Sequence, residues 1–72
     1  MARVAAIGAD WAVQGFGLAG ALVCRADDAP AVLAAWHHLP SDIAVVVVTA
    51  AAARSLPPEA FDRDWPMVAV LP

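Results

Sequence analysis

The 72-residue chain contains no lysine, no tyrosine and only one cysteine, and 15% of its residues are charged. Its four basic residues are scattered arginines that form no basic run, and the formal net charge is −3. Nucleic-acid binding normally needs a positive footprint, so this composition argues against a nucleic-acid partner. The lone Cys24 cannot form an internal disulfide, and beside Val23 and Arg25 it is expected to be a small buried residue of a strand.

The sequence also lacks a hydrophobic run long enough to cross a membrane as a helix. The stretch after Asp10 contains Gln14 and three of the four glycines, and it is shorter than the roughly 18 residues that a span requires. Asp10 also interrupts the first apolar run too early for a signal peptide. We therefore expect no direct membrane insertion, although the protein could belong to a membrane-associated assembly.

Apolar residues are abundant instead, at 62% of the chain. A single domain of this size buries only roughly 60% of the surface of its unfolded chain, so much apolar surface remains outside. This excess favours a docking module that covers part of its surface with a partner. The alternative is that alanine raises the hydrophobic content without making the surface adhesive.

Strand and helix signals alternate along residues 1–72, which predicts one α/β domain. Four consecutive valines, residues 45–48, are typical of a central strand of a parallel sheet. The predicted strands cover residues 3–8, 21–25, 42–49 and 67–71, and the predicted helices cover 11–19, 27–39 and 50–56. Right-handed crossovers then give a three-layer, Rossmann-like fold of the flavodoxin or receiver type, with a four-stranded parallel sheet in the order 2-1-3-4.

The segment GFGLAG, residues 15–20, has the glycine spacing of a dinucleotide-binding loop. In that fold the glycines follow the first strand directly and open the next helix. Here the first strand ends at Gly8, and the motif leads into a strand, so no helix N-terminus is available for a phosphate. We interpret Gly17 and Gly20 as allowing close helix packing, with Gly20 also reversing the chain.

No other group of residues in the sequence predicts a catalytic or ligand-binding site. A receiver-type phosphoacceptor site needs an aspartate after the third strand and a lysine after the fourth, and both are missing. His37 and His38 point about 100° apart on a helix, so they cannot easily share a metal ion. Their position near the end of the helix is better explained by a favourable interaction with the helix dipole. Ser41 and Ser55 flank prolines as turn residues, and residues 62–64 form an exposed connection. We therefore predict no catalytic residue, no cofactor and no metal.

The three tryptophans have different predicted roles. Trp36 lies on the apolar stripe of the second helix and is expected in the core, and Trp65 is expected to cover the edge of the sheet. Trp11 begins the first helix, where an exposed aromatic side chain would serve as an interface anchor.

Residues 4–20, 42–49 and 65–72 together resemble the F subunit of the V-type and archaeal-type rotary ATPases. That family begins with a strand ending in Ile-Gly, an acidic residue and Gly-Phe-x-x-Ala-Gly, matched here by Gly15, Phe16, Ala19 and Gly20. An apolar strand ending in Thr and a final strand between two prolines follow in the same order. One departure is Gly17, where the family usually has a charged or polar residue.

The resemblance implies a non-catalytic subunit of the central rotor stalk, cytoplasmic and peripheral to a membrane-bound complex. Such a protein docks on the coiled-coil rotor subunit, the D subunit, with the catalytic headpiece as a further possible contact, and links ATP chemistry to proton or sodium transport. The resemblance also implies that this chain, which stops at Pro72, lacks the C-terminal helical extension of the family. The positions expected to contact the partner are Asp10, Trp11, Phe16 and Gly20, with Phe16 alternatively in the core.

A second hypothesis keeps the topology but changes the function. In it, the chain is a degenerate receiver-like or flavodoxin-like module that binds a small nucleotide or flavin. Saturable binding of such a ligand would separate this hypothesis from the rotor-stalk hypothesis.

Overall fold

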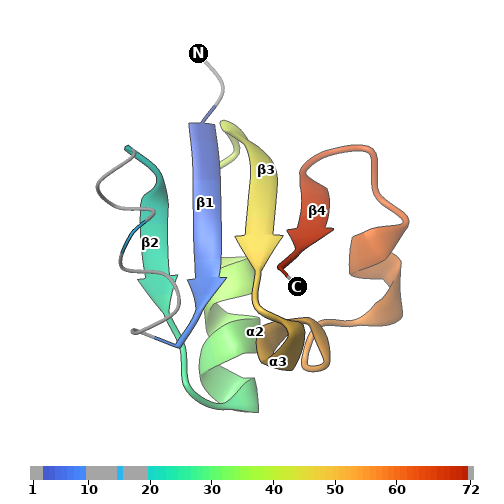
Figure 1. The fold of residues 1–72 in the computed structure, drawn as a ribbon. Helices are drawn as coiled ribbons and strands as arrows, with labels where there is room; N and C mark the ends of the chain where they lie inside the picture. Colours follow the sequence, from blue (N-terminus) through green and yellow to red (C-terminus); the bar gives the residue numbers. More distant parts are fainter. Residues whose placement is uncertain (1–2, 10–14, 16–19, 72) are drawn as a thin grey trace.

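The computed structural model describes residues 3–9, 15 and 20–71. In these residues the four predicted strands follow one another in the predicted order, with α2 between β2 and β3 and two short helices between β3 and β4 (Figure 1). The elements are β1 (Arg3–Gly8), β2 (Leu22–Arg25), α2 (Ala29–His37), β3 (Ile43–Val48), α3 (Ala50–Ala53), the 3-10 helix η1 (Pro58–Phe61) and β4 (Met67–Val70). The helix expected over residues 11–19, which would form the third layer, is almost entirely outside the described part.

The four strands form one parallel sheet in the order β2-β1-β3-β4, which confirms the predicted topology. A row of paired residues crosses the whole sheet: Leu22 lies opposite Ala5, Ala5 opposite Val46, and Val46 opposite Val68. Central strands that are covered by crossover helices need apolar residues at nearly every position, and the valine run of β3 supplies them.

A β-bulge near the start of β3 adjusts which side chains enter the core. Arg3 lies opposite Ile43, but Val4 lies opposite Val45, so Ala44 is an extra residue on β3. The extra residue places Ile43 on the same face as Val46 and Val48. The exposed fractions of these three side chains are only 1%, 0% and 0%.

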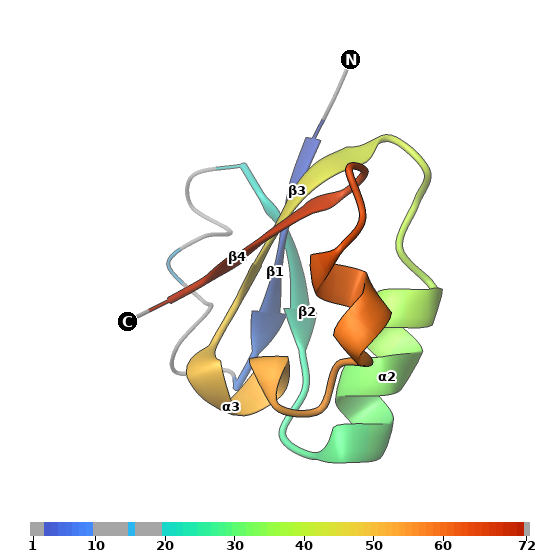
Figure 2. The ribbon, with the colours of Figure 1, turned by 90° about the vertical axis from the view of Figure 1, so that its right-hand side faces the viewer.

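The core lies between one face of the sheet and the helices that cover it. Figure 2 shows α2 and η1 on the same side of the sheet, with α3 beyond its carboxyl end. The helical side supplies Val32 and Trp36 from α2, Ala52 from α3, Leu56, and Ala60 from η1, all buried. Trp36 is therefore a core residue, as predicted.

Two predicted elements after β3 differ from the structure. The helix expected over residues 50–56 ends at Ala53, and tighter turns follow, in which Ser55 and Leu56 donate to Ala52 and Ala53. Leu56 precedes Pro57, and a residue before proline is disfavoured in the α conformation. Residues 58–61, for which no helix or strand was predicted, form η1, whose Ala60 is buried.

Gly20 adopts a φ of +88°, which an L side chain rarely adopts, so its predicted role in reversing the chain is confirmed. The predicted close packing is not found at this glycine. A Cβ atom placed on Gly20 meets no described atom within 4 Å. Gly17 lies outside the described residues. Glycine at position 20 is thus favoured by its backbone conformation, and no described atom crowds it.

Arg3 and Asp42 tie the start of β1 to the turn before β3. The guanidinium donates two hydrogen bonds to the carboxylate, at 2.6 and 3.1 Å, and the Arg3 amide donates to the Asp42 carbonyl at 2.9 Å. The hydrogen bond from Arg3 holds the pKa of the Asp42 carboxyl below its ordinary value. Both side chains are exposed, so solvent screens their attraction.

Truncation of Ile7, which is 0% exposed at the centre of the sheet, is expected to weaken the fold strongly. Ile7→Ala should lower the free energy of unfolding by about 2–5 kcal/mol, and Ile7→Val by about 0.5–1.5 kcal/mol, because buried methyl groups are lost and a cavity remains. Urea unfolding followed by tryptophan fluorescence measures both. Val4→Ala is the control, because Val4 is 39% exposed on the same strand. Equal losses in Ile7→Ala and Val4→Ala would contradict the description of the core.

The Asp42 ion pair should make stability sensitive to acid. A carboxyl group whose pKa is lowered in the folded state stabilises the fold fully above its unfolded pKa, about 3.9. That contribution disappears as the pH falls through the lowered folded pKa. We therefore expect Asp42→Asn to have a slightly lower thermal midpoint than the parent at pH 7, with a difference that shrinks below about pH 4. A difference that stays constant down to low pH would show that the pair contributes nothing.

Candidate functional site

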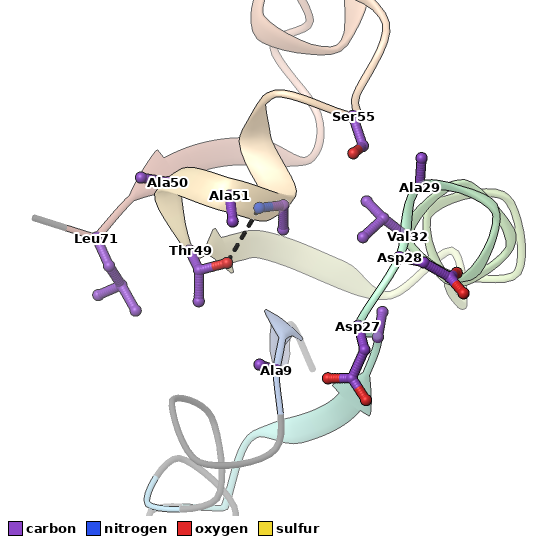
Figure 3. Close-up of a pocket in the computed structure, with 12 residues that line it drawn as sticks. Ala9, Asp27, Asp28, Ala29, Val32, Thr49, Ala50, Ala51, Ser55 and Leu71 are labelled. Carbon is purple, nitrogen blue, oxygen red and sulfur yellow. Dashed lines mark hydrogen bonds between the residues drawn. The ribbon is translucent and has the colours of Figure 1, made fainter.

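The carboxyl edge of the sheet is where parallel α/β folds usually bind ligands. A cavity of about 640 Å³ lies there, next to the ends of β1, β2 and β3 (Figure 3). Alanines and Val32 form much of its wall, and its side-chain polar groups come from Asp27, Asp28, Thr49 and Ser55. Its size falls within the roughly 300–1,000 Å³ range of small-molecule sites, so its chemistry has to be considered.

Two of these polar side chains already serve the backbone. The Thr49 hydroxyl oxygen accepts a hydrogen bond from the Ala52 amide at 3.1 Å, which caps α3 (Figure 3). The Asp28 carboxylate accepts a hydrogen bond from the Ala31 amide at 2.9 Å, which caps α2. Free amides at a helix start need such acceptors, so both residues have a structural role that requires no ligand.

The electrostatics of the cavity oppose a phosphate group. The charged residues that line it are Asp27 and Asp28, and no described lining residue is cationic. A phosphate placed there would be repelled by the two carboxylates and would lack a guanidinium or ammonium partner. The same feature weakens the nucleotide or flavin hypothesis.

The motifs that suggested a nucleotide, phosphoacceptor or metal site in the sequence do not come together at this cavity. Gly15 and Gly20 of the glycine motif are not among the described lining residues. β3 is followed by Thr49, which caps α3. A receiver domain would have its aspartate at this position. Within residues 3–9, 15 and 20–71, no group of three or more His, Cys, Asp or Glu side chains is arranged to hold a metal ion.

The remaining candidate side chains have packing or capping roles. The Cys24 thiol is half-buried and packs against the core, and burial raises its pKa, so it has little thiolate character. His38 lies at the C-terminus of α2, and its Nδ1 atom is 2.7 Å from the Ala34 carbonyl oxygen. Asp62 and Asp64 are exposed, as predicted.

The predicted partner-binding positions are only partly covered by the structure. Asp10, Trp11 and Phe16 lie outside the described residues, and Gly20 is an exposed turn residue before β2. Their role in docking stays a prediction.

Three large apolar residues from the end of η1 to the start of β4 are exposed, which the sequence did not predict. Phe61, Trp65 and Met67 are 45%, 55% and 61% exposed, so Trp65 is not the covering residue that was expected. The acidic residues of the same segment, Glu59, Asp62 and Asp64, are also exposed. Large apolar residues spaced between carboxylates, without a helical or alternating period, were the signal available in the sequence.

Several contacts fix the segment from η1 to β4 in place. Ala60 is 1% exposed and anchors η1 in the core. The guanidinium of Arg63 lies 5.8 Å from the centre of the Trp36 ring, within the range of a cation–π contact. The Trp65 indole Nε1 donates a hydrogen bond to the Ser41 carbonyl at 3.2 Å. The exposed aromatic groups therefore project from a segment attached to the fold at both ends.

The fold has a well-defined counterpart among known structures. No protein-family model and no curated protein matches the sequence. The crystal structure of the F subunit of the V-type ATP synthase of Archaeoglobus fulgidus matches with a TM-score of 0.83 and 20% sequence identity, over 99% of this chain and 98% of that one. The chain has the fold of that F subunit.

The similarity to the archaeal F subunit supports the fold expected from the glycine motif and the apolar strands. It covers 99% of this chain and is not limited to one shared motif. Among the described helices, none has the length and hydropathy needed to cross a bilayer.

The assignment of Thr49 and Asp28 as helix caps can be tested by comparing variants within the same cavity. Thr49→Ala and Asp28→Ala should each lower the free energy of unfolding by about 0.5–2 kcal/mol, because each leaves a helix-start amide without its acceptor. Ser55→Ala, in the same cavity, should change it by less than about 0.5 kcal/mol. Chemical denaturation checks all three. Equal effects of Thr49→Ala and Ser55→Ala would contradict the capping role.

Proposed function

We propose that the protein is a non-catalytic subunit of the central rotor stalk of a V-type or archaeal-type rotary ATPase. The observation that carries this proposal is the fold shared with the F subunit over 99% of the chain. A fold alone does not determine a function, because one fold can support many functions. The composition, the glycine motif and the exposed apolar groups add independent support.

The polar groups of the described residues support a role in docking. At the carboxyl edge Thr49 and Asp28 cap helices, and the described part has no buried polar or charged side chain. A catalytic site would need polar groups held out of water and aimed at a substrate. Exposed aromatic and apolar side chains are instead typical of protein interfaces.

In this proposal, the partner is the coiled-coil D subunit, and the two proteins turn together as one shaft. The chain would contribute shape and adhesion, and would help to couple ATP hydrolysis or synthesis to proton or sodium transport. It would act on the cytoplasmic side as a peripheral part of the membrane-bound complex. The segment around Asp10, Trp11, Phe16 and Gly20 is retained as one proposed contact with the coiled coil.

The second candidate function uses the cavity at the carboxyl edge of the sheet. Its volume of about 640 Å³ could admit a small ligand. Two carboxylates and no described cation line it, so a nucleotide or flavin phosphate would bind poorly. The cavity therefore supports the ligand-binding function less well than the shared fold supports the rotor-stalk function.

Co-expression with the coiled-coil rotor protein of the same genome tests the proposed function. We expect the two proteins to co-purify as a stable complex through gel filtration, because the chain leaves apolar surface that a partner would cover. An unrelated coiled-coil protein is the control for non-specific adhesion.

A monomer that elutes separately from the coiled-coil rotor protein would contradict the proposal. Titration of the isolated chain with ATP, NAD or FMN, followed by tryptophan fluorescence, tests the second candidate. Saturable binding in the micromolar range would favour that candidate instead.

A further inference from the structure

Strand β4 forms an open edge of the sheet. Among the described strands it pairs only with β3, and Figure 2, which looks onto this edge, shows no described helix or strand in front of it. Proteins usually protect such edges with charged side chains, prolines or bulges, because the unpaired N–H and C=O groups can pair with another chain. The opposite edge strand, β2, ends in the exposed Arg25, whereas residues 67–71 contain no charged residue and no proline.

The hydrogen bonds between β4 and β3 establish which backbone groups face this edge. The Leu71 amide donates to the Val48 carbonyl at 2.8 Å, so the backbone groups of Leu71 point toward β3. The N–H and C=O groups of one strand residue point to the same side, and successive residues alternate. The groups of Ala69 therefore also point toward β3, and those of Val68 and Val70 point toward the open edge.

These outward groups match a second copy of the same strand in the antiparallel direction. If Val68 lies opposite the partner's Val70, and Val70 opposite the partner's Val68, each pair exchanges both of its N–H···O=C hydrogen bonds. Ala69 then lies on a two-fold axis, in the close type of pair with Cα atoms about 4.5 Å apart, where its small side chain fits. A register shifted by two residues would bring Pro66 or Pro72 into the ladder, and neither proline has an N–H to donate.

The same register covers the large exposed side chains of β4. Met67 and Val70 are 61% and 48% exposed. On one face of the sheet Val70 would lie beside the partner's Val68, and on the other face Met67 would lie beside the partner's Leu71. Apolar cross-strand pairs stabilise antiparallel strands, and no like charges meet in this arrangement. So short a strand pair buries much less than the roughly 800 Å² per partner of a standard interface, so a weak and reversible dimer is expected.

We infer that two copies of the chain dimerise by antiparallel pairing of their β4 strands, which makes one sheet continue from copy to copy. A second copy is the partner because the outward backbone groups, the apolar side chains and the flanking prolines all agree with a two-fold axis through Ala69. The inference goes beyond the proposed function and does not depend on it, since it concerns the isolated chain.

Sedimentation equilibrium of the full chain, from micromolar to millimolar concentration, tests the inference. We expect the apparent mass to rise with concentration from that of one chain toward that of two. Ala69→Lys places two ammonium groups opposite each other on the axis, and should weaken dimerisation at least about tenfold. Ala69→Glu should weaken it as well, but a mixture of the two variants should form dimers again, because opposite charges then meet on the axis.

Cross-linking provides a second measurement that depends on the register. In a Cys24→Ala background, Ala69→Cys should form an intermolecular disulfide with oxidised glutathione, because Cα atoms about 4.5 Å apart lie within disulfide range. Val70→Cys should cross-link much more slowly, because the residue opposite it is the partner's Val68. Val4→Lys is the matched charge control, since Val4 is 39% exposed on β1, away from this edge, and the variant should dimerise within about twofold of the parent. The thermal midpoint of each variant checks that it is folded.

The outcomes separate this inference from the proposed function. The mass of a single chain at every concentration would overturn the inference, leave the edge to another occupant, and leave the rotor-stalk proposal standing. Dimers that Ala69→Lys and Val4→Lys weaken equally, or faster cross-linking of Val70→Cys than of Ala69→Cys, would also overturn it. So would growth into assemblies larger than two, because a symmetric contact closes after two copies.

Discussion

The parallel pairing of β1 with β3 is the interaction on which the rest of the structure depends. β1 also pairs with β2, and β3 also pairs with β4, so the order of the sheet follows from this central pair. Ala5, Ile7, Val46 and Val48 are each 0% exposed, and α2, α3 and η1 pack against the face that they form. A 72-residue chain buries too little surface to tolerate loss at this centre.

The small amount of surface that the chain buries explains where the polar groups lie. Thr49 and Asp28 cap helices at the carboxyl edge, and Arg3 with Asp42 joins β1 to the turn before β3 from the solvent side. The edge that serves as a ligand site in larger α/β folds is thus occupied by groups that hold this fold together. Large apolar side chains such as Phe61 and Trp65 also remain exposed, and a partner can cover them. The proposed docking function agrees with both features.

The sequence allowed the sheet order to be predicted, because β3 is apolar on both faces and the intervening helices have clear signals. Asp28, Pro30 and the spacing of Val32 and Trp36 predicted α2 well. The short helix η1 was missed, because one buried residue, Ala60, provides its tertiary support and leaves no periodic pattern. The exposure of Trp65 was missed because burial depends on which residues the fold places above it.

Hydrogen exchange of the chain, alone and mixed with the coiled-coil rotor protein, tests the central claim that this is a docking module for a rotor partner. We predict slower exchange around residues 10–20 on mixing, and no change in the core of β3, which is already buried. Exchange that is unchanged at every residue would contradict the account.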